Sequence, residues 1–161
     1  MITISLCMIV RDEEEVLGRC LDSVRNLVDE IIIVDTGSAD RTKEVAAAYT
    51  DQIYDFVWID DFAAARNYAL EKGRMRYLMW LDADDVIPAE ETGKFLKMKE
   101  RISDEDVIMM PYITAFDENG KASFFYYRER IVKNDVGFFF KGKVHEVIQP
   151  SGKIYYSDIP V

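Results

Sequence analysis

Acidic residues follow two apolar runs of the sequence, at positions where carboxylates could hold a divalent cation. Asp35 closes the run 30–35, and Asp82-Ala-Asp84-Asp85 follows the run 77–81. Such runs suit buried strands of a parallel sheet, whose carboxyl ends meet at one edge. In extended chain Asp82 and Asp84 would point the same way. Carboxylates grouped there would repel one another unless Mg²⁺ or Mn²⁺ lay between them, and that cation could hold a pyrophosphate.

The same acids also have a simpler interpretation. Aspartate is common in turns and helix caps, and two aspartates before a proline-initiated helix need no metal. A D-x-D pattern alone is therefore a weak signal. Its position directly after a run of apolar residues favours a functional role.

The elements that would position these acids alternate along the first hundred residues. Strands are expected over 2–10, 30–35, 53–59 and 77–81, and helices over 11–28, 41–49, 62–72 and 88–99. This alternation predicts βαβ units, and therefore an α/β fold whose mostly parallel sheet carries helices on both faces. After residue 104, strand-like runs at 107–116, 123–132 and 137–149 predict a smaller antiparallel or mixed part. We expect one domain over residues 1–161.

The composition of the chain argues against several classes of function. The chain has 161 residues, 49% of them apolar, and a net charge of −10, which argues against a nucleic-acid partner held by a basic surface. No apolar run approaches the roughly 20 residues of a transmembrane helix. The start of the chain resembles a strand more than a signal peptide, and two cysteines make no disulfide framework. We expect a cytoplasmic location, with a peripheral position at the inner face of the membrane left open.

Several segments in a fixed order resemble the opening of a family 2 glycosyltransferase. They are Ile4–Glu14, Val28–Thr42, Asp61–Ala69 and Trp80–Asp85, and the late Phe140–Glu146 resembles a segment of a bacterial subgroup. The resemblance covers nearly the whole chain. It implies the GT-A fold (a Rossmann-like nucleotide-diphospho-sugar transferase fold), a nucleotide-sugar donor, an inverting mechanism and Mg²⁺ or Mn²⁺.

The resemblance also implies roles for individual residues. Those expected to contact the nucleotide sugar, a UDP-sugar by family habit, are Asp12, Glu13, Asp35, Arg66, Asn67 and Asp82. Those expected at the metal are Asp84, Asp82 and His145. Glu146 is the candidate base, although adjacent strand residues would turn His145 and Glu146 to opposite faces. Other candidates left open are Asp85 at the metal, Asp117, Glu118 and Asp135 as base, and Arg128 and Arg130 at an anionic group.

The resemblance divides the chain into a nucleotide-binding part, 1–100, and an acceptor-side part, 101–161. The family usually continues further, so we expect the second part to be truncated. The acceptor is a glycan, a lipid or a peptide. The aromatic runs 124–127 and 138–140 suit sugar stacking, a core, or an apolar surface for a homo-oligomer.

Two other functions remain open. A nucleotide-sugar-binding or assembly module without catalysis would carry the same nucleotide-binding residues. A haloacid-dehalogenase-like phosphatase would use Asp82 as its nucleophile, but it lacks a convincing downstream lysine and acid pair.

Overall fold

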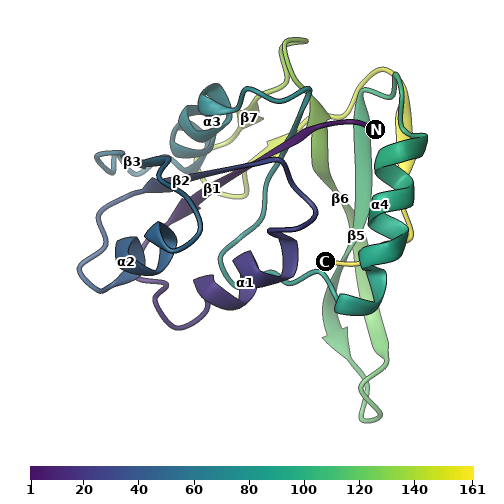
Figure 1. Ribbon diagram of the computed structural model, residues 1–161, viewed down its shortest axis with the longest axis horizontal. Coiled ribbons are helices and arrows are strands. Elements are labelled where there is room, and N and C mark those ends of the chain that lie inside the picture. Colours follow the sequence, from purple (N-terminus) through teal and green to yellow (C-terminus); the bar gives the residue numbers. More distant parts are fainter.

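One seven-stranded sheet runs through the molecule, in the strand order β3-β2-β1-β4-β6-β5-β9. The computed structural model describes residues 1–161 (Figure 1). The strands of this sheet are β1 (Ile4–Val10), β2 (Glu30–Asp35), β3 (Ile53–Asp55), β4 (Tyr77–Met79), β5 (Val107–Phe116), β6 (Ala122–Lys133) and β9 (Ile154–Tyr156). A separate small sheet pairs β7 (Phe140–Lys141) with β8 (Val147–Ile148). The helices are α1 (Leu17–Val24), α2 (Thr42–Ala47), α3 (Phe62–Lys72) and α4 (Thr92–Arg101), the last preceded by the 3-10 turn η1 (Ala89–Glu91).

The first four strands form the parallel part of the sheet. β1 pairs in parallel with β2 and β4, and β2 pairs in parallel with β3. β4 and β5 both pair antiparallel with β6, while β9 adds in parallel at the outer edge. The mostly parallel sheet and the antiparallel part after residue 104 are therefore as predicted.

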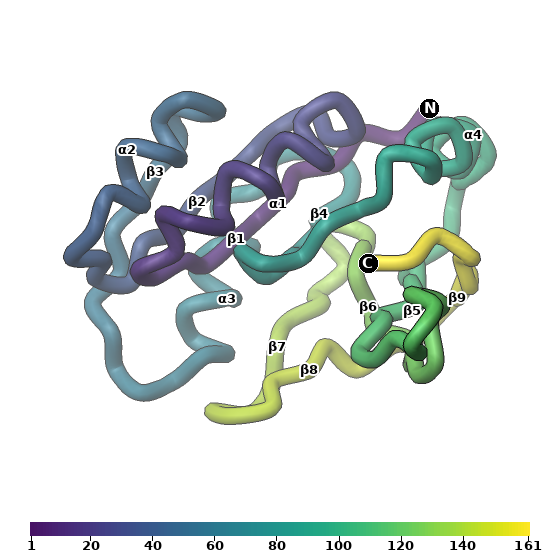
Figure 2. The backbone as a smooth tube through the Cα atoms, turned by 90° about the horizontal axis from the view of Figure 1, so that it is seen from below, coloured from purple at the N-terminus to yellow at the C-terminus, as the bar shows by residue number.

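Helices cover both faces of the sheet (Figure 2). α1, α2 and α4 lie on one face, where the larger apolar cluster packs Leu21 of α1, Ala46 of α2 and Phe95 of α4 against β1 and β4. α3 and the β7–β8 pair lie on the other face over a smaller cluster that includes Leu70, Trp80 and Phe140. Burial of these apolar side chains is the main force that holds the helices to the sheet.

The N-terminal boundary of α1 differs from the prediction. The helix begins at Leu17, because residues 11–15 form a turn in which Asp12 has a φ of 52°. The Asp12 carboxylate accepts the backbone N–H groups of Ala39 and Asp40, and the Glu14 carboxylate accepts that of Arg41. These acids therefore join two loops and do not cap a helix.

The run 137–149 also differs from the prediction of one strand. It forms the two short strands β7 and β8 with a tight turn between them, in which Gly142 and His145 have positive φ. None of the helices has both the length and the apolar character needed to span a bilayer.

Candidate functional site

The parallel strands end at one edge of the sheet, and a cleft opens there. In the β1–β2 register, Val10 lies opposite Asp35, and the chain leaves β4 at the same edge to reach Asp82. A cavity of about 600 Å³ occupies this edge, lined by Ile9, Val10, Arg11, Glu13, Thr36, Trp58, Phe62, Arg66, Asp82, Ala83, Asp84 and Tyr112. Ligands of open α/β sheets bind at this position. The cleft therefore has the location predicted from the strand order.

Asp35 is the last residue of β2, and its side chain holds the loop that follows. The side chain is 2% exposed, and Oδ1 accepts the N–H groups of Gly37 and Ser38 at 2.9 Å each. Oδ2 is buried and has no hydrogen-bond partner in the protein. A buried carboxylate oxygen without a partner is costly, so this atom is suited to accept a hydrogen bond from a ligand.

The structure separates the two neighbouring acids Asp12 and Glu13. Asp12 holds the loop around Ala39 and does not line the cleft, whereas the Glu13 side chain does. Partial burial raises the pKa of Glu13, and the charges of Asp84 and Asp82 raise it further. Three carboxylates therefore share one edge of the cleft.

The chain from Asp82 to Asp85 forms a tight turn, which corrects the expectation of an extended chain. The Asp85 N–H bonds to the Asp82 carbonyl, and the Asp82 N–H donates to the Asp85 carboxylate at 2.8 Å. Arg130 donates to the same carboxylate at 2.8 Å from β6, and both side chains are almost fully buried. This buried ion pair fixes the turn from behind and leaves the Asp84 side chain exposed.

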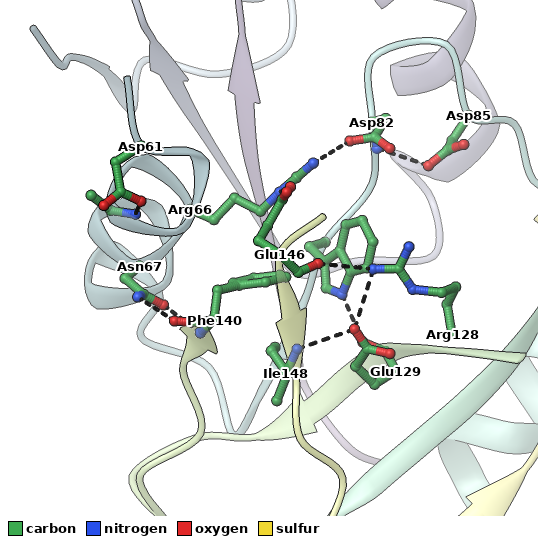
Figure 3. Close-up of polar contacts among 12 residues, drawn as sticks. Asp61, Arg66, Asn67, Asp82, Asp85, Arg128, Glu129, Phe140, Glu146 and Ile148 are labelled. Carbon is green, nitrogen blue, oxygen red and sulfur yellow. Dashed lines mark hydrogen bonds and ion pairs between the residues drawn. The ribbon is translucent and has the colours of Figure 1, made fainter. Parts of the chain in front are cut away.

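Arg66 of α3 links the acidic turn to the β7–β8 turn (Figure 3). Its Nη2 donates to Asp82 and its Nε donates to Glu146, both at 2.6 Å. The third nitrogen, Nη1, is buried without a hydrogen-bond partner. Burial alone would raise the pKa of Asp82, but the charge and hydrogen bond of Arg66, together with the charges of Arg130 and Arg128, outweigh burial and lower the pKa.

Trp80 supports this guanidinium and two others. Arg66, Arg128 and Arg130 each place the guanidinium carbon within 4.8 Å of the Trp80 ring centroid. Such cation–π contacts favour charged arginine where water is scarce. An acidic chain thus concentrates positive charge beside its cleft.

Glu146 and His145 line the same hollow, which corrects the expectation that they face opposite ways. This hollow, about 350 Å³, adjoins the cleft at Arg66 and Asp82 and also includes Trp80, Tyr126, Arg128 and Val147. The expectation assumed a strand, but His145 has a φ of 58° within a turn. A turn does not alternate its side chains between two faces.

Asn67 lies away from the cleft. Its amide nitrogen donates to the Phe140 carbonyl and its amide oxygen accepts the Phe140 N–H. Both polar atoms are therefore used to hold β7 against α3.

The other candidates are also distributed away from the cleft. Arg130 pairs with Asp85 through Nη1, and Asp117 is at the exposed β5–β6 turn, where its carboxylate accepts two backbone N–H groups. Glu118 is exposed at the same turn, and Asp135 lines a separate hollow beside α3. Trp58 and Tyr112 line the cleft but were missed, since single aromatic residues in a sequence give no signal of a shared site.

The residues present fit a divalent cation, although no group of three His, Cys, Asp or Glu side chains is arranged to hold one. The Asp84 carboxylate is exposed, and Asp82 uses only Oδ1 in its bond to Arg66. Mg²⁺ is usually held by one or two carboxylates together with substrate phosphates, so a complete protein cage is not required. Oxygen ligands of this kind suit Mg²⁺ or Mn²⁺.

This fold is that of the nucleotide-diphospho-sugar transferases. The sequence model described as Glycosyl transferase family 2 matches residues 5–157. The chain therefore belongs to glycosyl transferase family 2. Membership of this family speaks against the phosphatase alternative.

Two curated relatives match almost the whole chain. A TPR repeat-containing protein of Synechococcus elongatus is 34% identical over 152 residues, which are 94% of this chain and 36% of that protein. The glycosyltransferase SunS of Bacillus subtilis is 30% identical over 148 residues, 89% of this chain and 34% of that protein. The chain thus spans about a third of the length of these relatives.

Solved structures share the fold. Staphylococcus aureus TarS in complex with UDP-GlcNAc has a TM-score of 0.55 at 20% identity, over 71% of this chain and 36% of that one. Mycobacterium tuberculosis glucosyl-3-phosphoglycerate synthase, in complex with Mn²⁺ and UDP-glucose, has a TM-score of 0.56 at 21% identity, over 69% and 44%. The GT-A fold implied by the sequence is confirmed.

Proposed function

We propose that this chain binds a nucleoside-diphosphate sugar, UDP-linked, in the cleft and transfers the sugar with inversion to an acceptor. The observation that carries this proposal is that one cleft is lined both by Asp84, whose carboxylate is exposed, and by Arg66, whose Nη1 is buried without a partner. A metal-bound diphosphate carries the charges that complement both groups.

Asp35 and the rings beside it suit the nucleoside. The free Oδ2 of Asp35 is an acceptor for a base N–H or a ribose hydroxyl, and Thr36, next to it, lines the cleft. Trp58 and Phe62 offer aromatic surface at the same cleft, with ring centroids 4.8 Å apart. TarS and the M. tuberculosis synthase, both of this fold, were solved with UDP-sugars, which supports UDP as the first donor to test.

Asp84 and Asp82 would hold Mg²⁺ or Mn²⁺, with His145 within the neighbouring hollow as a further candidate. When bound, the cation would neutralise charge on the departing diphosphate. Arg66 would contribute to the same neutralisation through its free Nη1. Asp12 and Asn67 are not among the proposed donor contacts, because neither side chain lines the cleft.

Glu146 is the proposed base. In the transfer, an acceptor oxygen bonds to the anomeric carbon while the bond from that carbon to the diphosphate oxygen breaks. The bonding electrons leave with the diphosphate, and Glu146 takes the acceptor proton. Arg66 would fix the Glu146 carboxylate beside Asp82, at the junction of the cleft and its neighbouring hollow.

Calorimetric titration with UDP, in the presence and absence of Mn²⁺, tests the donor site. We expect binding that requires Mn²⁺, and we expect Asp84→Asn to abolish the Mn²⁺-dependent part. Asp51→Asn is the matched control, because Asp51 is exposed and lies outside the cleft. Binding of GDP and not of UDP would change the nucleotide assigned to the donor but would leave the class of enzyme unchanged. Full Mn²⁺-dependent binding by Asp84→Asn would refute the metal assignment, and failure of both nucleotides to bind would refute the donor site.

A binding or assembly module without catalysis is the second candidate. It is favoured by the ion pair of Glu146 with Arg66, which engages the carboxylate that the transfer would need. Glu146→Gln separates the two functions: loss of sugar transfer with intact UDP binding indicates catalysis. No transfer by the unaltered chain, with tight UDP-sugar binding, indicates a module.

A further inference from the structure

Aromatic side chains cover the exposed half of the β5–β6 hairpin, which extends beyond the body of the molecule (Figure 1). Solvent-exposed strands normally carry polar residues there, whereas Phe124 is 59% exposed, Phe125 51%, Tyr126 41% and Tyr127 40%. Single exposed apolar residues are common on protein surfaces, but a contiguous group of large ones usually marks a binding site.

These rings form two separate rows on opposite faces of the hairpin. The inner aromatic row consists of Tyr112, Phe124 and Tyr126, with ring centroids 5.5 Å apart for Tyr112–Tyr126 and 6.4 Å for Phe124–Tyr126. The outer aromatic row consists of Phe125, Tyr127 and Tyr156, with centroids 6.0 and 5.1 Å apart. The division follows from the alternation of side chains along β6.

Only the inner row reaches the candidate site. Tyr112 lines the donor cleft together with Asp82 and Asp84. Tyr126 lines the neighbouring hollow together with His145 and Glu146. Phe124 continues the row outward from Tyr126, about 7 Å further along the strand. The inner row is therefore a continuous aromatic surface that begins where the proposed transfer takes place.

We propose that the inner aromatic row binds a saccharide chain as the acceptor, an inference that rests on the proposed function and names its acceptor class. Pyranose rings have apolar C–H faces and hydroxyl edges. The inner row offers ring faces beside Arg128, His145 and Glu146, which can exchange hydrogen bonds with hydroxyl groups.

The surroundings favour a saccharide over other acceptors. A lipid chain is best held in an enclosed apolar channel, but these rings are half exposed and interleaved with charged groups. The net charge of −10 also disfavours adsorption of the chain to an anionic membrane surface. A neutral, amphipathic chain of sugars matches both properties of the surface.

Saturation-transfer NMR with cellopentaose, chitopentaose and maltopentaose tests the inference on the full chain. We expect at least one of them to bind, and we expect Phe124→Ala and Tyr126→Ala to weaken it about fivefold each. Phe125→Ala and Tyr127→Ala are matched controls on the outer row, with the same residue types and similar exposure. We expect these controls to change the affinity by less than about twofold.

Three results would overturn the inference. They are no binding of any of the three pentasaccharides, equal losses in the inner-row and outer-row variants, and binding to phosphatidylcholine vesicles in preference to the saccharides. UDP titration of the same four variants keeps the proposed function separate. Saccharide binding without UDP binding would refute the donor site and leave the inner aromatic row as a saccharide-binding surface. UDP binding without saccharide binding would refute only the proposal for the inner aromatic row.

Discussion

The two halves of the sheet present their functional side chains in different ways. In the parallel half, residues 1–101, the loops at the cleft are held by buried groups such as Asp35 and Asp85. In the antiparallel half, residues 102–161, the inner aromatic row stands on a hairpin with solvent around it. A charged diphosphate needs groups fixed at set distances, whereas rings that stack on sugars tolerate some freedom. The difference suggests that the proposed donor site is fixed and that the proposed acceptor surface is adaptable.

The acidic turn of the proposed donor site is held by a residue of the other half, and Arg130→Met tests this dependence. Loss of Arg130 leaves the Asp85 carboxylate buried without its charged partner, so we expect the free energy of unfolding to fall by about 3–5 kcal/mol. Urea denaturation measures the change, and the exposed Arg41→Met is the control.

The double variant Asp85→Asn with Arg130→Met removes both charges and should recover part of the loss. A loss below about 1 kcal/mol for Arg130→Met alone would show that the acidic turn does not depend on this pair.

Asn67→Ala tests the second connection between the halves. Two hydrogen bonds to the Phe140 backbone are lost, and we expect a cost of about 2 kcal/mol in urea denaturation. Asn119→Ala, at the exposed hairpin turn, is the matched control. UDP binding should survive, because Asn67 does not line the cleft. Loss of UDP binding in a folded Asn67→Ala protein would restore Asn67 to the donor site.

The sequence predicted the parallel half better than the antiparallel half, and the reason is the range of the contacts. Apolar runs and helical spacing are local, so the sequence alone predicts that Asp35 and Asp82 lie at one edge of the sheet, where the structure has them. The bond from Arg66 to Glu146 joins residues 80 positions apart. No local pattern encodes such a contact. The run 137–149 has strand-like composition, but Gly142 and the positive φ of His145 turn it into a hairpin.

Two glycines allow the halves to be compared directly. Gly37 in the loop after β2 and Gly120 in the β5–β6 turn have φ of 112° and 76°, and an added Cβ would meet no atom within 4 Å at either site. Gly37→Ala and Gly120→Ala therefore add backbone strain without a clash, at about 1 kcal/mol each.

We expect only Gly37→Ala to weaken UDP binding, because the Gly37 N–H donates to Asp35. Calorimetry on both variants makes the comparison. Equal effects on UDP affinity would mean that the donor loop is no more sensitive to its geometry than the hairpin turn.

The smallest effect concerns the outer edge of the antiparallel half, where exposed charges join the strands. Asp104 bonds to Lys153 before β9 and to Lys133 at the end of β6, and these partners lower the pKa of Asp104 from 3.8 to about 2. Because the pKa is lower in the folded chain, this contribution to stability is present above pH 3.8 and is lost as the pH falls towards about 2.

Asp104→Asn should therefore flatten the pH dependence of the urea midpoint within that acidic range, and Asp51→Asn should leave it unchanged. The effect of Asp104→Asn should also shrink in 1 M salt, because the Debye length there is only about 3 Å and exposed ion pairs are screened. A salt-independent effect would mean that this edge, like the donor side, is held by buried charge. The contrast between a donor side fixed by burial and an acceptor side joined at its surface would then be wrong.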